Sequence, residues 1–473
     1  MRTQVAAPER EPEAPYNLAA RVYGSGPRLA FASAAPALAL EAPALPSRPA
    51  RDEAPKAKVG LFSALADSNF RLLYLGNVAQ FASMQMQLLV RGYLVFQLTG
   101  SFAALGTMAL ANAVPGLIFS PIGGVVADRA PKKTVIQIAQ MYNVINAAVL
   151  AVLAAGLFGL HLQFWHLFLS AFLQGGVNSV MMPARQSIIS DLVPRDRLMN
   201  AIAINTSGQN LMQLIGPALG GFLIAWVSPA AVFALMGAMY GLAVTFTMRL
   251  PKHPVYAFTG GAHGPRGRAR GGRGAGAARD LLDGMKYVAK DPIIRLLMVV
   301  NFMIVLVAMP YTMLLPGFVK EVLGKGAFEQ GIMVALSGVG ALGGSLAVAA
   351  SPETGRGRLM LGWGLLLGVA LTGFAISTNF WITLPIMLLI GAGQAGRMSI
   401  GQVLVQSYSQ DEFRGRVQSV WFMQFSLVQF GTFFVGVLAE FVGPQLAIGG
   451  LAALMAISMV LVYSFVPTMR RLD

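Results

Sequence analysis

The chain has 473 residues, of which 55% are hydrophobic and only 12% are charged, and its mean hydropathy is +0.62. Soluble domains carry about 25% charged residues, so this composition excludes an ordinary soluble enzyme and a disordered protein. The chain has no cysteine, which also excludes a disulfide scaffold, a thiolate metal site and a thiol nucleophile. The net charge of +15 is compatible either with binding to nucleic acid or with a membrane protein that has basic cytoplasmic loops.

The first 58 residues are rich in Ala, Pro, Arg and Glu. They lack the basic start, uninterrupted apolar core and cleavage site of a signal peptide. We predict a disordered cytoplasmic tail here, with a weak amphipathic or targeting role as the alternative.

After this tail, runs of about 20 or more mostly apolar residues recur, each long enough to cross ~30 Å of hydrocarbon as a helix. They do not alternate in the way that the strands of a membrane β-barrel do. The sequence therefore predicts an all-α membrane protein with twelve transmembrane helices. We place these spans at 71–98, 102–127, 134–158, 163–190, 200–226, 229–249, 293–319, 328–350, 359–377, 380–408, 417–440 and 443–466.

Basic residues gather in the turns after the even-numbered spans, whereas the turns after spans 1, 3, 5, 9 and 11 have none. The turn after span 7 is an exception, with Lys320 and Lys325 beside Glu321 and Glu329. By the positive-inside rule, both termini are expected in the cytoplasm. The basic residues of these turns include Lys132, Lys133, Arg195, Arg197, Arg249, Arg356, Arg358, Arg414 and Arg416.

A Gly/Arg-rich linker at 251–288 separates a six-span half at 59–250 from a second six-span half at 289–473. Spans 4 and 10 carry similar Gln-Gly and Gln-Ala-Gly sequences, which suggests parallel repeats with a substrate site between the halves. The stretch 260–279 could bind RNA or anionic lipid, but we favour a flexible, solvated cytoplasmic loop and expect no nucleic-acid partner.

The most specific motif follows span 2 and reads Gly124-Val125-Val126-Ala127-Asp128-Arg129-Ala130-Pro131-Lys132-Lys133. It resembles the signature loop of the major facilitator superfamily, although Pro131 and Lys132 stand where that family has Gly and Arg. The resemblance implies that Asp128 contacts the N-terminus of span 11 near residues 415–417 and closes the cytoplasmic side. The alternative is that the basic residues only determine topology.

We assign a cytoplasmic gate around this motif, and expect Arg185 to pair with Asp191 within it. The gate consists of Gly124, Asp128, Arg129, Lys132, Lys133, Arg185, Asp191, Arg414 and Arg416.

Span 5 contains a helix-packing motif of Gly216, Pro217, Gly220 and Gly221, which resembles the core of a motif found in antiporter members of the superfamily. This favours export over import, with packing alone as the alternative. Ala171 stands where the antiporters have Arg, and no Asp or Glu lies in the middle of a span. Proton coupling is therefore an expectation from the family, which these residues do not support directly.

Two arginines, Arg91 and Arg397, lie inside predicted spans and need a partner, a cavity or water. The resemblance implies that spans 1, 4, 7 and 10 line a central cavity, where these arginines could contact an anionic part of a substrate. Snorkelling, or a pair between Arg91 and Glu440, is the alternative. The predicted cavity residues are Arg91, Gln85, Gln174, Asn178, Asn301, Gln394 and Arg397, and the methionines among them suit a bulky amphipathic molecule.

Short segments such as Pro183-Ala184-Arg185-Gln186 and Leu198-Met199-Asn200-Ala201 resemble the branch that contains bacterial enterobactin exporters and related secretion transporters. This resemblance implies a monomeric secondary transporter of the bacterial inner membrane that exports a drug- or siderophore-like molecule, with protons as a candidate coupling ion. An importer of a small organic solute is the alternative, and an intramembrane enzyme or a channel is the alternative from a different class. No catalytic residue, metal or cofactor is expected, because the four histidines form no His-Glu-x-x-His motif and the chain has no phosphate-binding loop.

Overall fold

The computed structural model describes residues 63–251, 255–256, 273–352 and 354–472. The predicted tail at 1–58 lies outside the described residues, as do 257–272 of the predicted linker. Side chains are not described at 120–125, 127–129, 195 and 273–280. The secondary structure of the described residues is entirely helical, which agrees with the predicted class.

Six long helices form the first part of the described chain. They are α1 (Ser68–Thr99), α2 (Phe102–Arg129), α3 (Lys132–Ala154), α4 (Phe164–Leu192), α5 (Arg195–Trp226) and α6 (Pro229–Met248).

Local sequence explains why α1 and α2 begin and end where they do. The carboxylate of Asp67 accepts hydrogen bonds from the backbone N–H groups of Asn69 and Phe70, which satisfies two free donors at the start of α1. Gly100 ends α1 with a φ of 63°, a left-handed conformation that glycine adopts at little cost. Ser101 then caps α2 by accepting from the N–H of Ala104.

The second part contains the remaining long helices. They are α8 (Pro292–Ala308), α9 (Tyr311–Glu321), α10 (Ala327–Ala349), α11 (Arg356–Ile376), α12 (Phe380–Tyr408), α13 (Arg414–Val442) and α14 (Pro444–Phe465), followed by the short α15 (Pro467–Arg470).

Two of these helices differ from the prediction of one continuous span at 293–319. The chain divides into α8 and α9 at Met309 and Pro310. Pro310 has no backbone N–H to continue the ladder, and the N–H groups of Thr312 and Met313 bond to the carbonyl oxygens of Met309 and Pro310, three residues back, in a tighter turn.

Part of the predicted linker is also helical, since Arg273–Lys290 form α7. The predicted linker at 251–288 is therefore not a loop from Arg273 onward, and the solvated loop expected at 260–279 overlaps the start of this helix. The second half of α7 carries an apolar face that packs on the start of α13. The ring of Tyr287 stacks on that of Phe413 with centroids 4.5 Å apart, and Val288 is buried.

Nine helical stretches in the described residues are long and apolar enough to cross a membrane, with α8 and α9 counted together. Helices α1, α5 and α12 are as long, at 32, 32 and 29 residues, but are not among the nine. The polar side chains of α1, such as Gln80, Gln87 and Arg91, lie buried inside the protein rather than toward lipid. The complete set of twelve spans therefore stays a prediction.

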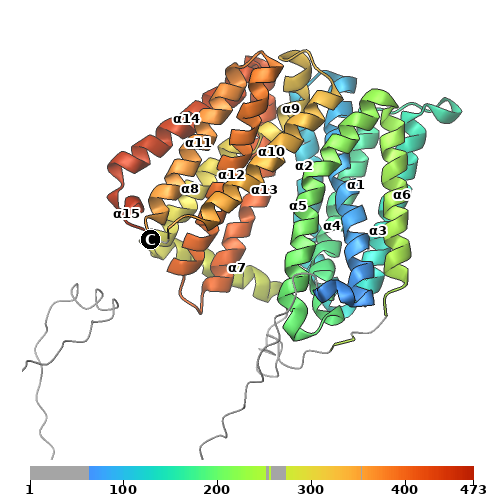
Figure 1. Ribbon diagram of the computed structural model, residues 1–473, viewed down its shortest axis with the longest axis horizontal. Helices are drawn as coiled ribbons and strands as arrows, with labels where there is room; N and C mark the ends of the chain where they lie inside the picture. The colour runs from blue at the N-terminus through green and yellow to red at the C-terminus, as the bar shows by residue number, and fades with distance from the viewer. Residues whose placement is uncertain (1–62, 252–254, 257–272, 353, 473) are drawn as a thin grey trace, which may run out of the picture. The chain divides into compact units, whose positions relative to one another are not determined.

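The helices pack in a repeated pattern. Contacts of α2 with α4 and of α3 with α6 recur as contacts of α10 with α12 and of α11 with α14. We call α1–α6 the first helix group and α8–α14 the second. The two groups contact each other through α5 with α10 and through α2 with α13. In Figure 1 they converge at the end where α9 lies, which we call the α9 end, and diverge toward the end where α7 lies, the α7 end.

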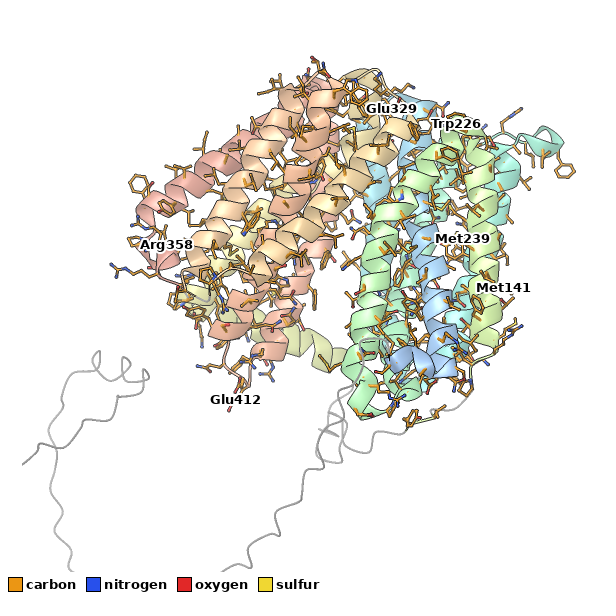
Figure 2. All side chains as sticks on the ribbon, in the orientation of Figure 1. Met141, Trp226, Met239, Glu329, Arg358 and Glu412 are labelled. Atoms are coloured by element: carbon orange, nitrogen blue, oxygen red, sulfur yellow. The ribbon has the colours of Figure 1, made fainter. Side chains whose placement is uncertain are left out.

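Labelled side chains mark these two ends. Figure 2 shows Trp226 of α5 and Glu329 of α10 at the α9 end, and Glu412, between α12 and α13, at the α7 end. Helix α2 starts and α13 ends at the α9 end. The contacts between them there join residues more than 300 positions apart in the sequence, such as Phe102 and Glu440.

Candidate functional site

A carboxylate joins the two helix groups at the α9 end. Glu440 of α13 accepts hydrogen bonds through Oε2 from the backbone N–H of Phe102 at 2.7 Å, from that of Ala103 at 3.1 Å and from the hydroxyl of Ser101 at 3.0 Å. The first N–H groups of a helix have no partner within the helix and carry partial positive charge. Glu440 therefore caps α2 with charge-assisted hydrogen bonds that cross between the groups.

Glycines allow the backbones of the two groups to meet at the same end. A Cβ atom added at Gly221 of α5 would lie 2.4 Å from the carbonyl oxygen of Ala327, and one at Gly331 of α10 would lie 2.8 Å from that of Pro217. A Cβ at Gly436 would similarly lie 2.7 Å from the carbonyl oxygen of Phe102. Only glycine fits such approaches without a backbone shift.

The glycines of the predicted motif in span 5 thus contact both helix groups. Gly216 and Gly220 lie against Gln85 and Met86 of α1, within the first group. The neighbouring Gly221 contacts α10 of the second group. A single turn of α5 therefore fixes the position of α1 and also forms part of the contact between groups.

Aromatic side chains add to the contact at the α9 end. The rings of Phe96 and Phe102 lie with centroids 4.9 Å apart, and both pack around Gly317 of α9. The ammonium group of Lys320 lies 5.7 Å from the centre of the Phe96 ring.

The predicted cytoplasmic gate lies at the α7 end, and the structure describes only part of it. The backbone of Gly124, Asp128 and Arg129 belongs to α2, but the side chains of Asp128 and Arg129 are not described, so the contact of Asp128 with residues 415–417 stays a prediction.

The described basic residues of this gate make contacts within their own group. Lys132 of α3 forms an ion pair of 2.7 Å with Asp191 of α4, and Lys133 donates to the carbonyl oxygens of Met248 and Leu250.

In the second group, Arg414 pairs with Asp411 at 2.7 Å, and the guanidinium of Arg416 lies 5.4 Å from the centre of the Phe413 ring. These contacts stabilise the helix ends near the α7 end.

The expected pair of Arg185 and Asp191 is not what the structure shows, because Asp191 is bound to Lys132. Arg185 is buried and donates instead to Oε1 of Gln80, with its guanidinium 4.8 Å from the centre of the Phe81 ring. Gln140 also donates to that Gln80 oxygen, at 3.0 Å. Arg185 thus belongs to a polar cluster of α1, α3 and α4 rather than to a surface ion pair.

Arg91 is the centre of a second buried cluster in the first group. Its Nη2 donates to Oε1 of Gln174 at 2.7 Å and to the hydroxyl of Ser170 at 3.1 Å. Gln174 in turn donates to Gln87 at 2.7 Å. Glu440 is occupied by α2, so the alternative pair of Arg91 with Glu440 is also absent from the structure.

Arg397 occupies a comparable place in the second group. It is 1% exposed, and its Nη1 donates to Oδ1 of Asn301 at 3.2 Å. Asn301, itself fully buried, donates to Gln424 of α13 at 3.1 Å.

The predicted cavity residues therefore fall into two classes. Arg91, Gln174, Asn301 and Arg397 are buried inside one helix group or the other, and the two arginines are not brought together. Gln85, Asn178 and Gln394 are half-buried, and Gln394 donates to the sulfur of Met309 at 3.3 Å.

Three further amides belong to the buried clusters: Gln80 accepts from Arg185, Gln87 from Gln174, and Gln424 from Asn301. From the sequence, Gln80 and Gln87 are only two of several neutral polar residues within the spans, Gln424 has no indicated role, and Glu440 is only a candidate partner for Arg91. One available indication was that Glu440 is the only acidic residue in the predicted eleventh span, 417–440.

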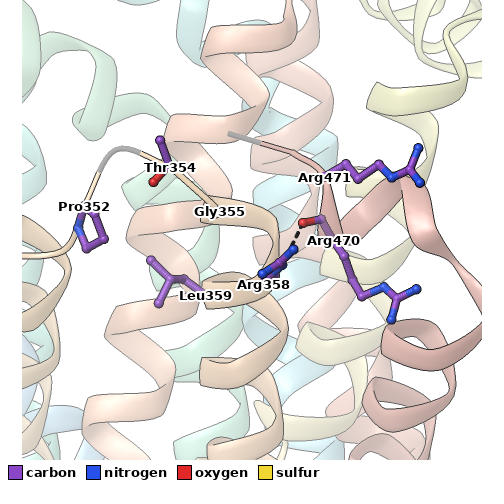
Figure 3. Close-up of a pocket in the computed structure, with 7 residues that line it drawn as sticks. All are labelled: Pro352, Thr354, Gly355, Arg358, Leu359, Arg470 and Arg471. Carbon is purple, nitrogen blue, oxygen red and sulfur yellow. Dashed lines mark hydrogen bonds between the residues drawn. The ribbon is translucent and has the colours of Figure 1, made fainter.

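A surface hollow lies away from these clusters, at the start of α11 (Figure 3). Arg358 donates there through Nε to the carbonyl oxygen of Arg470 at 3.1 Å. In the part of the chain that the structure describes, no group of three or more His, Asp or Glu side chains could hold a metal ion. The hollow is lined by Pro352, Thr354, Gly355, Arg358, Leu359, Arg470 and Arg471.

Comparison with protein families gives one match that covers nearly the whole chain. The model of the transmembrane secretion effector family matches residues 59–473. Similar curated proteins include the uncharacterized MFS-type transporter YfiS of Bacillus subtilis, 25% identical over 74% of this chain and 82% of its own length.

Two further relatives have named activities. The staphyloferrin A transporter of Staphylococcus aureus is 24% identical, over 72% of this chain and 81% of its own length. The multidrug efflux pump Tap of Mycolicibacterium fortuitum is 25% identical, over 80% of this chain and 91% of its own length.

Solved structures share the fold at lower identity. The nucleoside transporter NupG has a TM-score of 0.63 and 15% identity, and the match covers 85% of this chain and 98% of that one. A bacterial homologue of the human lysosomal transporter Spinster has a TM-score of 0.60 and 16% identity, over 85% and 95% of the two chains.

Proposed function

Because the chain belongs to the transmembrane secretion effector family of major facilitator transporters, we propose that it exports a small amphipathic molecule across the bacterial inner membrane by alternating access. Drug-like and siderophore-like molecules are the substrate classes that the relatives' names support, since these include a multidrug efflux pump and a staphyloferrin A transporter.

The observation that carries this proposal is the Glu440 contact with α2. Alternating access requires that the two helix groups separate at one end of the protein while they meet at the other. A few hydrogen bonds to a helix N-terminus and close glycine contacts can break and re-form without unfolding either group. From the distribution of basic residues we place the α9 end outside, where the contact between the groups would close the protein to the outside.

We expect the substrate to contact half-buried amides rather than the buried arginines. Gln85, Asn178 and Gln394 are partly exposed and come from α1, α4 and α12. Amides bind neutral polar groups of either hydrogen-bonding sense, and nearby methionines adapt to apolar surfaces of different shape. This combination suits amphipathic molecules of varied structure.

The carboxylate of Glu440 has charged neighbours at the α9 end. It is exposed, and it interacts electrostatically with Glu321 of α9, beside which Lys320 lies. The buried polar side chains of the described residues include arginines and amides but neither Asp nor Glu. We therefore propose proton coupling from the family alone, with no residue assigned to it.

The test is efflux of ethidium and of erythromycin from energised cells, with and without a protonophore. We expect the wild type to export at least one of these probes and the Glu440→Gln variant to export it several-fold more slowly. Glu412→Gln changes an exposed carboxylate at the other end and serves as the matched control. Proton coupling predicts that the protonophore abolishes export.

Three results would count against parts of this proposal. Export that persists with the protonophore would remove proton coupling alone. Faster accumulation of a probe than in cells without the protein would reverse the direction. Normal export by the Glu440→Gln variant would show that transport does not require the Glu440 contact at the α9 end.

A further inference from the structure

The buried guanidinium of Arg397 is incompletely paired. Only Nη1 donates, to Asn301, while Nε and Nη2 are buried and have no hydrogen-bond partner. Arg91 also has a buried Nε without a partner, but its Nη2 donates to two acceptors, Gln174 and Ser170. Burying a charged guanidinium without hydrogen-bond partners costs free energy, so we expect another group to bind beside Arg397.

The side chains near Arg397 present additional free donors. Gln424, which accepts from Asn301, keeps its Nε2 buried without a partner, and so does Trp421 with its indole Nε1. Trp421 and Gln424 lie one turn apart on α13. The Trp421 ring packs at Gly401, one turn beyond Arg397 on α12.

All four of these unpartnered atoms are donors. The two carbonyl oxygens of the cluster, on Asn301 and Gln424, already accept hydrogen bonds. A group bound here must therefore accept several hydrogen bonds. Among the buried side chains that the structure describes there is also no carboxylate to balance the charge of Arg397.

We propose that the second helix group binds one small anion, a halide or a carboxylate, between α8, α12 and α13, with Arg397, Trp421 and Gln424 as its donors. A negative charge satisfies the donors and neutralises the guanidinium at once, whereas a neutral water would leave the charge uncompensated. The site lies inside one group, so the inference does not depend on the direction of transport.

The experiment compares anions at equal ionic strength on the purified full-length protein. Sodium chloride, sodium acetate and sodium gluconate are titrated, and the fraction that remains monodisperse on size-exclusion chromatography after heating is measured. An anion that binds only the folded protein raises its midpoint temperature. We expect a saturable rise of a few degrees with chloride or acetate and none with the bulkier gluconate.

Two variants test the donors. Arg397→Gln should abolish the rise, and Trp421→Phe, which keeps an aromatic ring but removes the N–H, should weaken anion binding about tenfold. Trp363→Phe is the matched control, since Trp363 packs at Gly396, next to Arg397, and its Nε1 is not among the buried unpartnered atoms. If Arg397→Gln does not fold, Trp421→Phe still decides the question.

The outcomes distinguish the two anion sources. A rise with chloride and acetate alike assigns the site to any small free anion, and a rise with acetate alone assigns it to carboxylates. Equal midpoints in all three salts, or an unchanged rise in Trp421→Phe and Arg397→Gln, would overturn the proposal.

Discussion

At the scale of single residues, the protein handles its charges inside the bundle and at its ends in different ways. Buried arginines are held by amides, as Arg91 is by Gln174 and Arg185 by Gln80. The carboxylates are used at helix ends, as Asp67 is on α1 and Glu440 is on α2. A carboxylate at a helix start gains from the free N–H groups, and it needs no basic partner.

The Glu440→Gln variant tests the strength of this arrangement. An amide oxygen is a weaker acceptor than a carboxylate, and a charge-assisted hydrogen bond is about twice as strong as a neutral one. We expect the state that is closed at the α9 end to be destabilised by about 1.4 kcal/mol relative to the open state, which is a tenfold shift in their populations. The measurement uses Ala327→Cys, which is 2% exposed, as a reporter in this cysteine-free chain.

The reporter should react about tenfold faster with a membrane-impermeant maleimide in the Glu440→Gln background. Glu412→Gln combined with Ala327→Cys should leave the labelling rate unchanged, because Glu412 lies at the α7 end. Equal rates in all three proteins would show that the Glu440 cap does not hold the groups together.

At the scale of helices, glycine placement determines which surfaces can meet. On α10, Gly331 faces Pro217 of α5 so closely that a methyl group would lie 2.8 Å from its carbonyl oxygen. On the same helix Gly343 has open space around it. The two glycines therefore offer a matched pair within one element.

We expect Gly331→Ala to push α5 and α10 apart and Gly343→Ala to be neutral or stabilising. Alanine inside a helix is favoured over glycine by about 1 kcal/mol, and only at residue 331 does a steric clash outweigh this gain. Ala327→Cys labelling and probe efflux both report the difference. Slower labelling in Gly331→Ala than in Gly343→Ala would contradict the steric argument.

The helices were also the part of the fold that could be predicted from the sequence. Runs of apolar residues are a local property, so the predicted 380–408 coincides with α12, and 229–249 differs from α6 by one residue. The break at Pro310 and the helix α7 were missed because the apolar run continues through the proline, and because the Gly- and Arg-rich composition of the linker hid the amphipathic end of α7.

Pairing between residues could be predicted less well, for a physical reason. Arg185 and Asp191 are six residues apart on α4, but partners are decided by which neighbouring helix lies within reach. Lys132 of α3 reaches Asp191, and Gln80 of α1 reaches Arg185. The same holds for Glu440, whose partners lie 337 to 339 positions away.

At the scale of the whole molecule, the contact at the α9 end should be required to open during transport. A cross-link across it tests this without altering Glu440 itself. Ala103 lies beside the Glu440 contact on α2, and Phe441 follows Glu440 on α13 and is 83% exposed. Ala103→Cys with Phe441→Cys can be joined by a short bis-maleimide that contains a cleavable disulfide.

Joined through this linker, the two groups cannot separate at the α9 end, so we expect efflux to stop and to return when a reductant cleaves the linker. Each single-cysteine variant treated with the same reagent controls for modification alone. Full efflux with the α2–α13 cross-link intact would mean that the substrate passes without separation of the groups. Transport would then have to proceed by movements within each group, and the Glu440 cap would be a structural element rather than a gate.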